Sequence, residues 1–165
     1  MSPRPPLLVF CGAPGCGKTT IARILRGKIS GVVHIQTDAV RQMIGTPKYT
    51  PPESEFVYES CIGIAREALK RGRPVLLDGT FAQSRHRTRA FSSLRGLFGR
   101  SLVVQVECDV DTARRRNASR KVMVPEEKLN AIHIHFEAPY RALKVNTDMH
   151  SAEECAALVL AALGR

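Results

Sequence analysis

The sequence is short of long apolar stretches. None of its apolar runs approaches the roughly 20 residues that a membrane-spanning helix needs, and the first, 7–11, leads directly into a glycine-rich motif, which predicts a strand rather than a signal peptide. Cys-x-x-Cys spacing is also absent, and the five cysteines are scattered along the chain. This pattern predicts free, mostly buried thiols in a reducing compartment. We therefore expect a cytoplasmic protein.

Acidic residues are scarce relative to basic ones. The 165 residues include 25 Lys and Arg against 15 Asp and Glu, which gives a net charge of +10. The excess gathers in the segment 85–121, where ten basic residues stand against three acidic ones. Such a segment attracts polyanions such as nucleic acid. The alternative is that most of these residues are solvated surface charges and a few arginines bind ATP. The length, without repeats or linkers, predicts a single domain over 1–165.

The most specific motif lies between an apolar run and an amphipathic segment. It fits G-x-x-x-x-G-K-[ST], the phosphate-binding loop. Backbone N–H groups in such a loop cradle an anion, and the positive end of the following helix adds to the field. Lys18 is expected to reach the β- and γ-phosphates, and the Thr19 hydroxyl to bind Mg²⁺. The residues predicted to hold the nucleotide are Gly12, Ala13, Pro14, Gly15, Cys16, Gly17, Lys18, Thr19 and Thr20.

Asp38 follows a second predicted strand, 32–36, and begins a short predicted helix, 38–44. A carboxylate at the carboxyl end of a parallel strand faces the ligand crevice, where it can accept the proton of an attacking hydroxyl. Arg41 lies three residues further on and shares its helix face. The alternative is that Asp38 only caps the helix and Arg41 is a surface residue. The phosphate loop favours the catalytic interpretation.

Asp78 ends a third predicted strand, 74–78, which is continuously apolar, as a central parallel strand is. In phosphate-loop enzymes an acidic residue at this place orients Mg²⁺ or its water shell. The alternative is an ordinary turn residue. A basic helix, 84–98, is predicted to follow, and we expect Thr80 and Arg85 near its N-terminal end to contact the acceptor substrate.

Four arginines occur within seven residues after the fourth predicted strand: Arg114, Arg115, Arg116 and Arg120. They would repel one another without an anionic partner. On a continued helix Arg116 and Arg120 would lie on one face. We expect them to form a lid, about 114–128, that closes over the transferring phosphates and neutralises charge in the transition state. The alternative is a basic helix terminus that complements the helix dipole.

Strands and helices alternate along the chain. The five predicted strands cover 7–11, 32–36, 74–78, 102–108 and 142–147. A long helix over 53–71 carries an apolar stripe of Phe56, Val57, Ile64, Ala65, Ala68 and Leu69. Ser151 with Glu154 forms a capping box for the last helix. The order predicts an α/β fold of three layers, with a five-stranded parallel sheet, helices on both faces and an arginine-rich lid.

Taken together, these motifs resemble those of the small phosphate-loop kinases. The matching segments are 12–19, 37–41, 77–80, 116–120 and 124–125, in that order. Within this group the chain is similar to the polynucleotide 5′-kinase domain and the seryl-tRNA kinases, with zeta toxins and adenylylsulfate kinases as further relatives. The segment 136–139 resembles the F-[DE]-x-P piece of the seryl-tRNA kinases, and 146–148 resembles their adenine-side loop.

The resemblance implies the P-loop NTPase fold, with ATP and Mg²⁺ as cofactors. It also implies a general base at Asp38, an acceptor-positioning residue at Arg41, and a lid built on Arg116 and Arg120. The hypothesis is a phosphotransferase that moves the γ-phosphate of ATP to an acceptor hydroxyl, preferably a 5′-hydroxyl of nucleic acid or a tRNA-linked group. The alternatives are a small-molecule kinase (acting on a nucleoside, sugar, antibiotic or adenylylsulfate) and a nucleotide-binding regulatory or toxin-like module. The expected partners are ATP and a nucleic-acid or other phosphorylated acceptor, without a membrane.

Overall fold

The computed structural model describes residues 3–164, and its centre is the predicted parallel sheet. The five strands lie in the order β2-β3-β1-β4-β5. They are β1 (Leu7–Cys11), β2 (Val33–Gln36), β3 (Val75–Asp78), β4 (Ser101–Glu107) and β5 (Leu143–Asn146). The helices are α1 (Lys18–Lys28), α2 (Thr37–Ile44), α3 (Pro51–Lys70), α4 (Ser84–Leu94), α5 (Val110–Ala118), α6 (Glu126–Ile134) and α7 (Ala152–Gly164).

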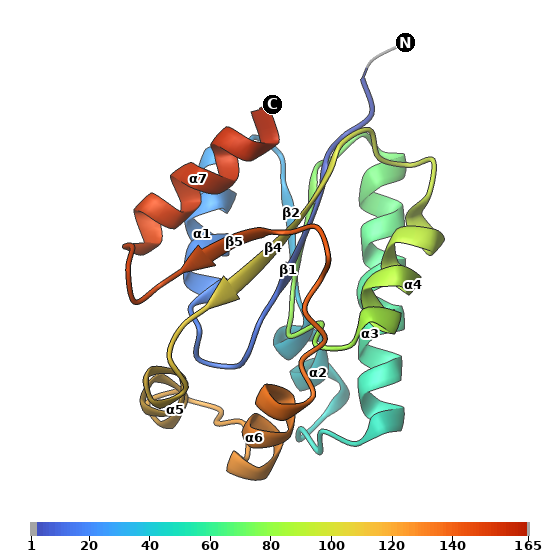
Figure 1. Cartoon of the computed structure of the whole chain (residues 1–165). Coiled ribbons are helices and arrows are strands. Elements are labelled where there is room, and N and C mark those ends of the chain that lie inside the picture. Colours follow the sequence, from blue (N-terminus) through green and yellow to red (C-terminus); the bar gives the residue numbers. More distant parts are fainter. Residues whose placement is uncertain (1–2, 165) are drawn as a thin grey trace.

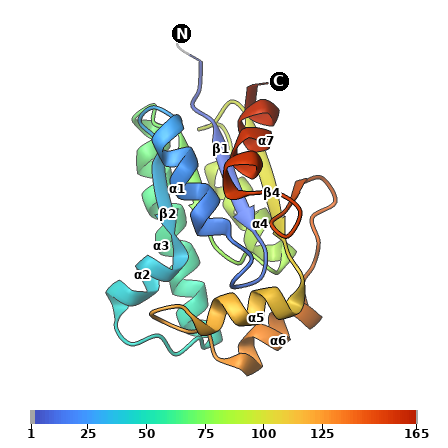
Figure 2. The same ribbon diagram turned by 90° about the vertical axis from the view of Figure 1, so that its left-hand side faces the viewer.

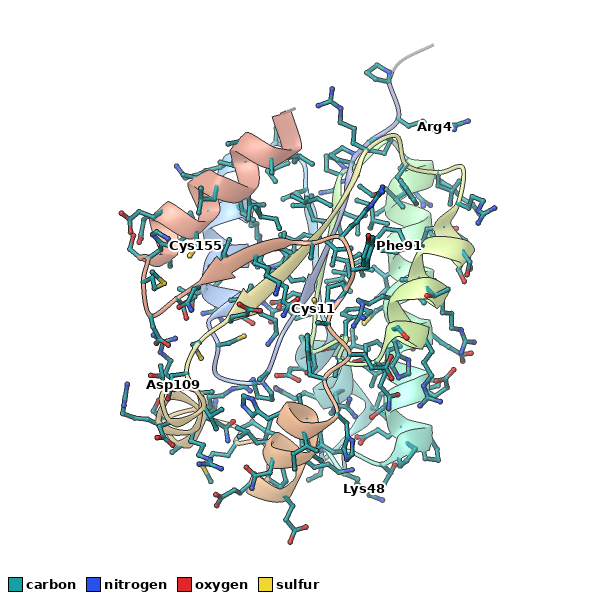
Figure 3. The ribbon with its side chains drawn as sticks, viewed as in Figure 1. Arg4, Cys11, Lys48, Phe91, Asp109 and Cys155 are labelled. Atoms are coloured by element: carbon teal, nitrogen blue, oxygen red, sulfur yellow. The ribbon has the colours of Figure 1, made fainter. Side chains whose placement is uncertain are left out.

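Helices cover both faces of the sheet, which gives the predicted three layers (Figure 1). Successive residues of β1 point to opposite faces, so Leu7 and Val9 pack with α3 and α4, while Leu8 and Phe10 pack with α1 and α7. Every residue of β1 is buried, because β1 pairs with β3 on one side and β4 on the other. Phe91 points from α4 toward the sheet (Figure 3). These two apolar cores fix the sheet on which the site is built.

Two details differ from the sequence prediction. Phe56 and Ile64 of the predicted stripe on α3 are exposed by 55% and 45%, whereas its other four residues are buried as expected. Helix α4 ends at Leu94 rather than near 98, because Arg95 takes an extended conformation. The residues beyond it still pack against the core as irregular chain.

Side chains cap the N-terminal ends of α5 and α7. The Asp109 side chain accepts a hydrogen bond from the Asp111 N–H at the start of α5. In the capping box of α7, the Ser151 N–H donates to Glu154 and the Glu154 N–H donates to the Ser151 hydroxyl. Between residues 3 and 164 no helix is long and apolar enough to span a bilayer.

The carboxyl ends of the parallel strands meet at one edge of the sheet. Helices α2, α5 and α6 gather at this edge, away from the two layers that cover the faces (Figure 2). The turn from β1 into α1 lies at the same edge. The molecule therefore places its phosphate-loop motif, Asp38 and the arginine-rich segment around one region.

Candidate functional site

The phosphate-loop motif forms the predicted turn between a strand and a helix. Gly17 is the N-cap of α1 in a left-handed conformation, and Lys18 is the first residue of the helix. The Lys18 Nζ donates hydrogen bonds to the Gly12 carbonyl at 2.8 Å and the Ala13 carbonyl at 2.7 Å. The lysine is thus folded onto the loop, with its ammonium group at the mouth of the turn.

Glycine is required at two positions of this loop. Gly12 and Gly15 have φ values of 143° and 85°. An added Cβ would lie 2.3 Å from the Val106 carbonyl oxygen at Gly12, and 2.2 Å from the Ala113 carbonyl oxygen at Gly15. The loop therefore packs directly on backbone, and any side chain at either position has to move it. Ala113 belongs to α5, so the same close approach joins the loop to the arginine-rich helix.

A cleft of about 950 Å³ opens beside the loop. From the loop it is lined by Pro14, Gly15, Gly17, Lys18, Thr19 and Thr20. Gly12 and Cys16 are buried behind these residues. The other lining residues predicted from sequence are Asp38, Arg41, Asp78, Thr80, Arg85, Arg116 and Arg120. The structure thus brings the predicted catalytic, metal and substrate residues to one cavity.

Asp38 is the second residue of α2, so it is not the N-cap of that helix. Its carboxylate forms an ion pair with the guanidinium of Arg120, which is 82 residues away in the sequence. Asp38 and Arg120 are both partly exposed. The predicted base and one of the predicted lid arginines are therefore in direct contact.

Arg41 is buried and held by a polar cluster. Its Nη1 lies 2.9 Å from the Glu53 carboxylate, and its guanidinium lies 4.8 Å from the centre of the Tyr49 ring. Burial alone would raise the pKa of Glu53, but the Lys48 N–H and the Arg41 charge outweigh it and lower that pKa below its ordinary value. Within residues 3–164 no acceptor makes a well-angled hydrogen bond to the buried Arg41 Nε and Nη1. Nη1 is still engaged by the Glu53 carboxylate through their ion pair, whereas Nε has no such partner among the described residues.

Aromatic rings form another wall of the cleft. Tyr58 stacks on His86 with ring centres 4.3 Å apart, and its hydroxyl accepts a hydrogen bond from the Phe81 N–H at 3.2 Å. Burial raises the pKa of Tyr58 to about 12, so the phenol stays protonated. Burial, with the charges of Arg85 and Arg87, lowers the pKa of His86, so the ring is neutral at pH 7. This wall therefore carries no charge of its own.

The oxygen ligands predicted for Mg²⁺ are Thr19 and Asp78, and both line the cleft. The Asp78 carboxylate is 3.0 Å from the His34 Nε2, and both side chains are almost fully buried. No group of three His, Cys, Asp or Glu side chains close enough to hold a metal occurs in the described part of the chain. This arrangement fits Mg²⁺, which takes one or two protein oxygens and completes its shell with phosphates and water.

Arg116 and Arg120 do not share a helix face. Helix α5 ends at Ala118, so Arg120 lies beyond it and turns toward Asp38. Arg116 instead donates to the Thr147 hydroxyl at 2.8 Å, and that hydroxyl donates to the Cys16 carbonyl at 2.9 Å. The expectation of one continued helical face is wrong, because the helix stops before the second arginine. The two arginines therefore have different partners, Thr147 and Asp38.

Several residues at or beside the site carry no sequence signal. His34 sits within β2 and meets Asp78 only through pairing of β2 with β3. Arg87 is buried and donates to the Phe81, Ala82 and Glu137 carbonyls, which holds the chain between β3 and α4. Thr80 and the exposed Arg85 line the cleft, and the Arg85 Nε donates to Gln83 at 2.8 Å.

This fold and its phosphate-loop cleft define a P-loop NTPase with a kinase-like architecture. More closely, the chain belongs to the AAA domain family AAA_33, whose model matches residues 7–139. No curated protein sequence matches the chain.

Solved structures share the fold at low identity. The Mycobacterium tuberculosis APS kinase CysC, in complex with AMPPNP and APS, has a TM-score of 0.78 at 19% identity, with 99% of each chain covered. A gluconokinase from Sinorhizobium meliloti 1021 has a TM-score of 0.71 at 20% identity, covering 99% of this chain and 94% of that one. A chain of the Pnkp1/Rnl/Hen1 RNA repair complex has a TM-score of 0.70 at 20% identity, covering 82% of this chain and 45% of that one. The three-layer P-loop fold is confirmed.

Proposed function

We propose that the protein is an ATP- and Mg²⁺-dependent kinase that moves the γ-phosphate to an acceptor hydroxyl. One observation carries the proposal: Lys18 and Thr19 of the phosphate loop share a cleft with Asp38, Arg41 and Arg120. A nucleotide site alone would explain only the first two. The carboxylate and the two arginines are what phosphoryl transfer needs on the acceptor side.

The proposed reaction uses Asp38 as the base. Its carboxylate accepts the proton of the acceptor hydroxyl as the acceptor oxygen bonds to the γ-phosphorus. The bond from that phosphorus to the β,γ-bridging oxygen breaks, and ADP leaves with the electron pair. The loop N–H groups and Lys18 neutralise the phosphate charge.

Arg120 has to change partners in this scheme. In the structure it pairs with Asp38; in the reaction it pairs with the phosphates, which frees the carboxylate to act as a base. Thr19 and Asp78 would hold the Mg²⁺, which supplies charge neutralisation between the β- and γ-phosphates when bound. The segment 114–128, called the lid segment below, would close this side of the cleft, and Arg116 would fix its helix through Thr147.

The favoured acceptor is a 5′-hydroxyl of nucleic acid or a tRNA-linked group. The cleft lining contains only two carboxylates in the described chain, Asp38 and Asp78. Against them stand Lys18, Arg23, Arg41, Arg85, Arg116, Arg120, Lys121 and Lys128. This exceeds what ATP alone neutralises and supports an acceptor that carries phosphate.

A small-molecule acceptor is the second candidate. The observation in its favour is that the APS kinase and the gluconokinase match nearly the full length of this chain, whereas the RNA-repair protein is more than twice as long as the part that matches. Under this proposal Arg41 and Arg85 would line a compact acceptor pocket. The two proposals differ in their response to salt, because only a polyanionic acceptor releases condensed counterions on binding.

The test is transfer of label from γ-labelled ATP with Mg²⁺ to two acceptor sets. One set holds 5′-hydroxyl DNA and RNA oligonucleotides and total tRNA; the other holds nucleosides, sugars, an aminoglycoside and adenylylsulfate. Label on nucleic acid, with kcat/KM falling steeply as salt rises, supports the favoured acceptor. Label only on a small molecule, with weak salt dependence, supports the second. If the protein binds ATP but transfers phosphate to neither acceptor set nor to water, the result supports a nucleotide-binding regulatory module instead of a kinase.

A further inference from the structure

Between α5 and α6 the chain makes a short loop, 119–123, that is closed by one side chain. The Asn117 Nδ2 donates to the Val124 carbonyl at 2.9 Å, and the Asn117 Oδ1 accepts from the Val124 N–H at 3.2 Å. Asn117 and Val124 are 6% and 4% exposed. A side-chain amide that pairs with both backbone groups of one residue acts as a two-point clip.

The clipped loop carries Arg120 into the cleft. The Arg120 N–H also donates to the Asn117 carbonyl at 3.1 Å, so the residue is tied to the clip through its own backbone. From there its guanidinium reaches Asp38. Lys121, the next residue, also lines the cleft. Asn117, whose side-chain amide is buried, is thus only three residues from Arg120, which forms the ion pair with Asp38.

Without the clip Arg120 would keep its bond to the Asn117 backbone carbonyl, but the loop that carries it would lose its tie at Val124. Arg120 lies beyond the end of α5, where no helical hydrogen bond holds the side of the loop that leads to Val124. Arginine side chains have large rotamer entropy, so keeping the Arg120 guanidinium at one place depends on a rigid backbone. A displacement of about 1 Å of a group at a reacting centre can cost about a hundredfold in rate.

We propose that Asn117 is a positioning residue for phosphoryl transfer, acting through Arg120 by closing the 119–123 loop. The proposal rests on the proposed function, because Arg120 has a role in rate only if the protein transfers phosphate. Asn117 itself touches neither the nucleotide cradle nor the acceptor side of the cleft: its side-chain partner is Val124.

The kinetic test is a double-mutant cycle of Asn117→Ala and Arg120→Ala. We expect Asn117→Ala to lower kcat about 10- to 100-fold and to change the KM for ATP less than about threefold. Added to Arg120→Ala, it should lower kcat less than about twofold further, because its effect passes through the missing arginine. Independent, multiplying losses would overturn the proposal.

The matched control is Gln105→Ala. Gln105 is a buried amide in β4, 5% exposed, whose Nε2 donates to Glu107 at 2.6 Å and which does not line the cleft. It should lose stability but keep kcat within about twofold. A comparable fall in kcat for this control would assign the Asn117 effect to stability. Asn117→Asp keeps the acceptor for the Val124 N–H and should lie between wild type and Asn117→Ala, which also covers the case in which Asn117→Ala does not fold.

A second readout does not depend on turnover. The Arg120 Nε–H signal in an NMR spectrum, assigned by its loss in Arg120→Ala, reports whether that guanidinium is ordered. We expect it to move to the random-coil position in Asn117→Ala and to stay in place in Gln105→Ala. A signal unmoved in Asn117→Ala overturns the positioning role even if the enzyme is active. A signal that moves in a protein without any phosphotransfer upholds the clip and overturns the proposed function alone.

Discussion

The phosphate loop and the lid segment lie against each other and are built in opposite ways. The loop is held by its own backbone: Gly12 and Gly15 adopt positive φ angles, and Lys18 bonds to carbonyls five and six residues away. The lid segment is held by contacts from distant sequence. Arg116 reaches Thr147, and Arg120 reaches Asp38.

Under the proposed function, the difference separates binding from catalysis. A loop shaped by its own backbone conformations and packed closely on the Val106 and Ala113 carbonyls is rigid, which suits a cradle for phosphate. Arg120 can exchange partners, because its ion pair with Asp38 is partly exposed and another anion can replace the carboxylate. We expect substitutions in the loop to abolish binding, and substitutions in the lid segment to lower the rate of a protein that still binds.

Gly15→Ala is expected to act on binding. The new Cβ would lie 2.2 Å from the Ala113 carbonyl oxygen at a φ of 85°, so the loop must shift away from its phosphate-binding shape. Nucleotide affinity, measured by calorimetry, should fall at least about 100-fold. The control is Gly27→Ala in α1, where a Cβ meets nothing within 4 Å; it should bind normally and gain up to about 1 kcal/mol in stability. Normal nucleotide binding by Gly15→Ala would contradict the claim that local backbone geometry makes the cradle.

Arg120→Ala is expected to act on rate. Loss of an arginine that neutralises transition-state charge costs about a thousandfold or more in kcat, whereas ATP affinity should change little because Lys18 and the loop remain. The control is Arg115→Ala, near the end of α5, whose side chain is exposed and bonds only weakly to Thr112 at 3.3 Å. Steady-state kinetics should show the loss in the first variant and less than about a twofold change in the second. Equal losses of kcat in both variants would show that the lid segment contributes only general positive charge, with no specific role for Arg120.

A middle-sized effect is expected where the two regions touch. The Thr147 hydroxyl accepts from Arg116 and donates to the Cys16 carbonyl, so Thr147→Val removes both links at nearly constant volume. The free energy of unfolding should fall by about 1–3 kcal/mol, and both nucleotide affinity and kcat should fall, by about tenfold or less. Thr147→Ser keeps the hydroxyl and should restore both. If Thr147→Val changed neither, the loop and the lid segment would be independent.

The smallest effect is a pH dependence of stability near the aromatic wall. The pKa of His86 is lowered in the fold, mainly by burial, so the unfolded chain, with a pKa near 6.5, takes up this proton first as pH falls. Stability should therefore be unaffected above about pH 7.5 and should decrease as pH falls through about 6.5. Thermal unfolding between pH 8 and 5 should show a weaker decrease for His86→Gln than for wild type, and an unchanged one for His150→Gln, which alters an exposed histidine. Parallel curves for all three proteins would assign the pH dependence to other groups.

The same division decides what the sequence could predict. The loop, the alternation of strands and helices along the chain, and the positions of Asp38 and Asp78 at strand ends follow from local patterns, and the structure places them as expected. The pairs Asp38–Arg120 and His34–Asp78 join residues far apart in the chain, so the local spacing of residues does not predict them. The sequence also did not predict that α5 ends before Arg120, because Ser119 and Arg120 are both compatible with a helix.

The central claim is tested most directly by comparing Asp38→Asn with wild type in two assays on the same preparations: ATP binding by calorimetry and phosphate transfer from γ-labelled ATP. The substitution removes the proton acceptor and keeps the side-chain shape. We predict ATP binding within about threefold of wild type and a transfer rate lowered by about 10²- to 10⁴-fold. A transfer rate that stays near wild type would show that Asp38 is not the base, and the account of the cleft as a phosphotransfer site built around it would be wrong.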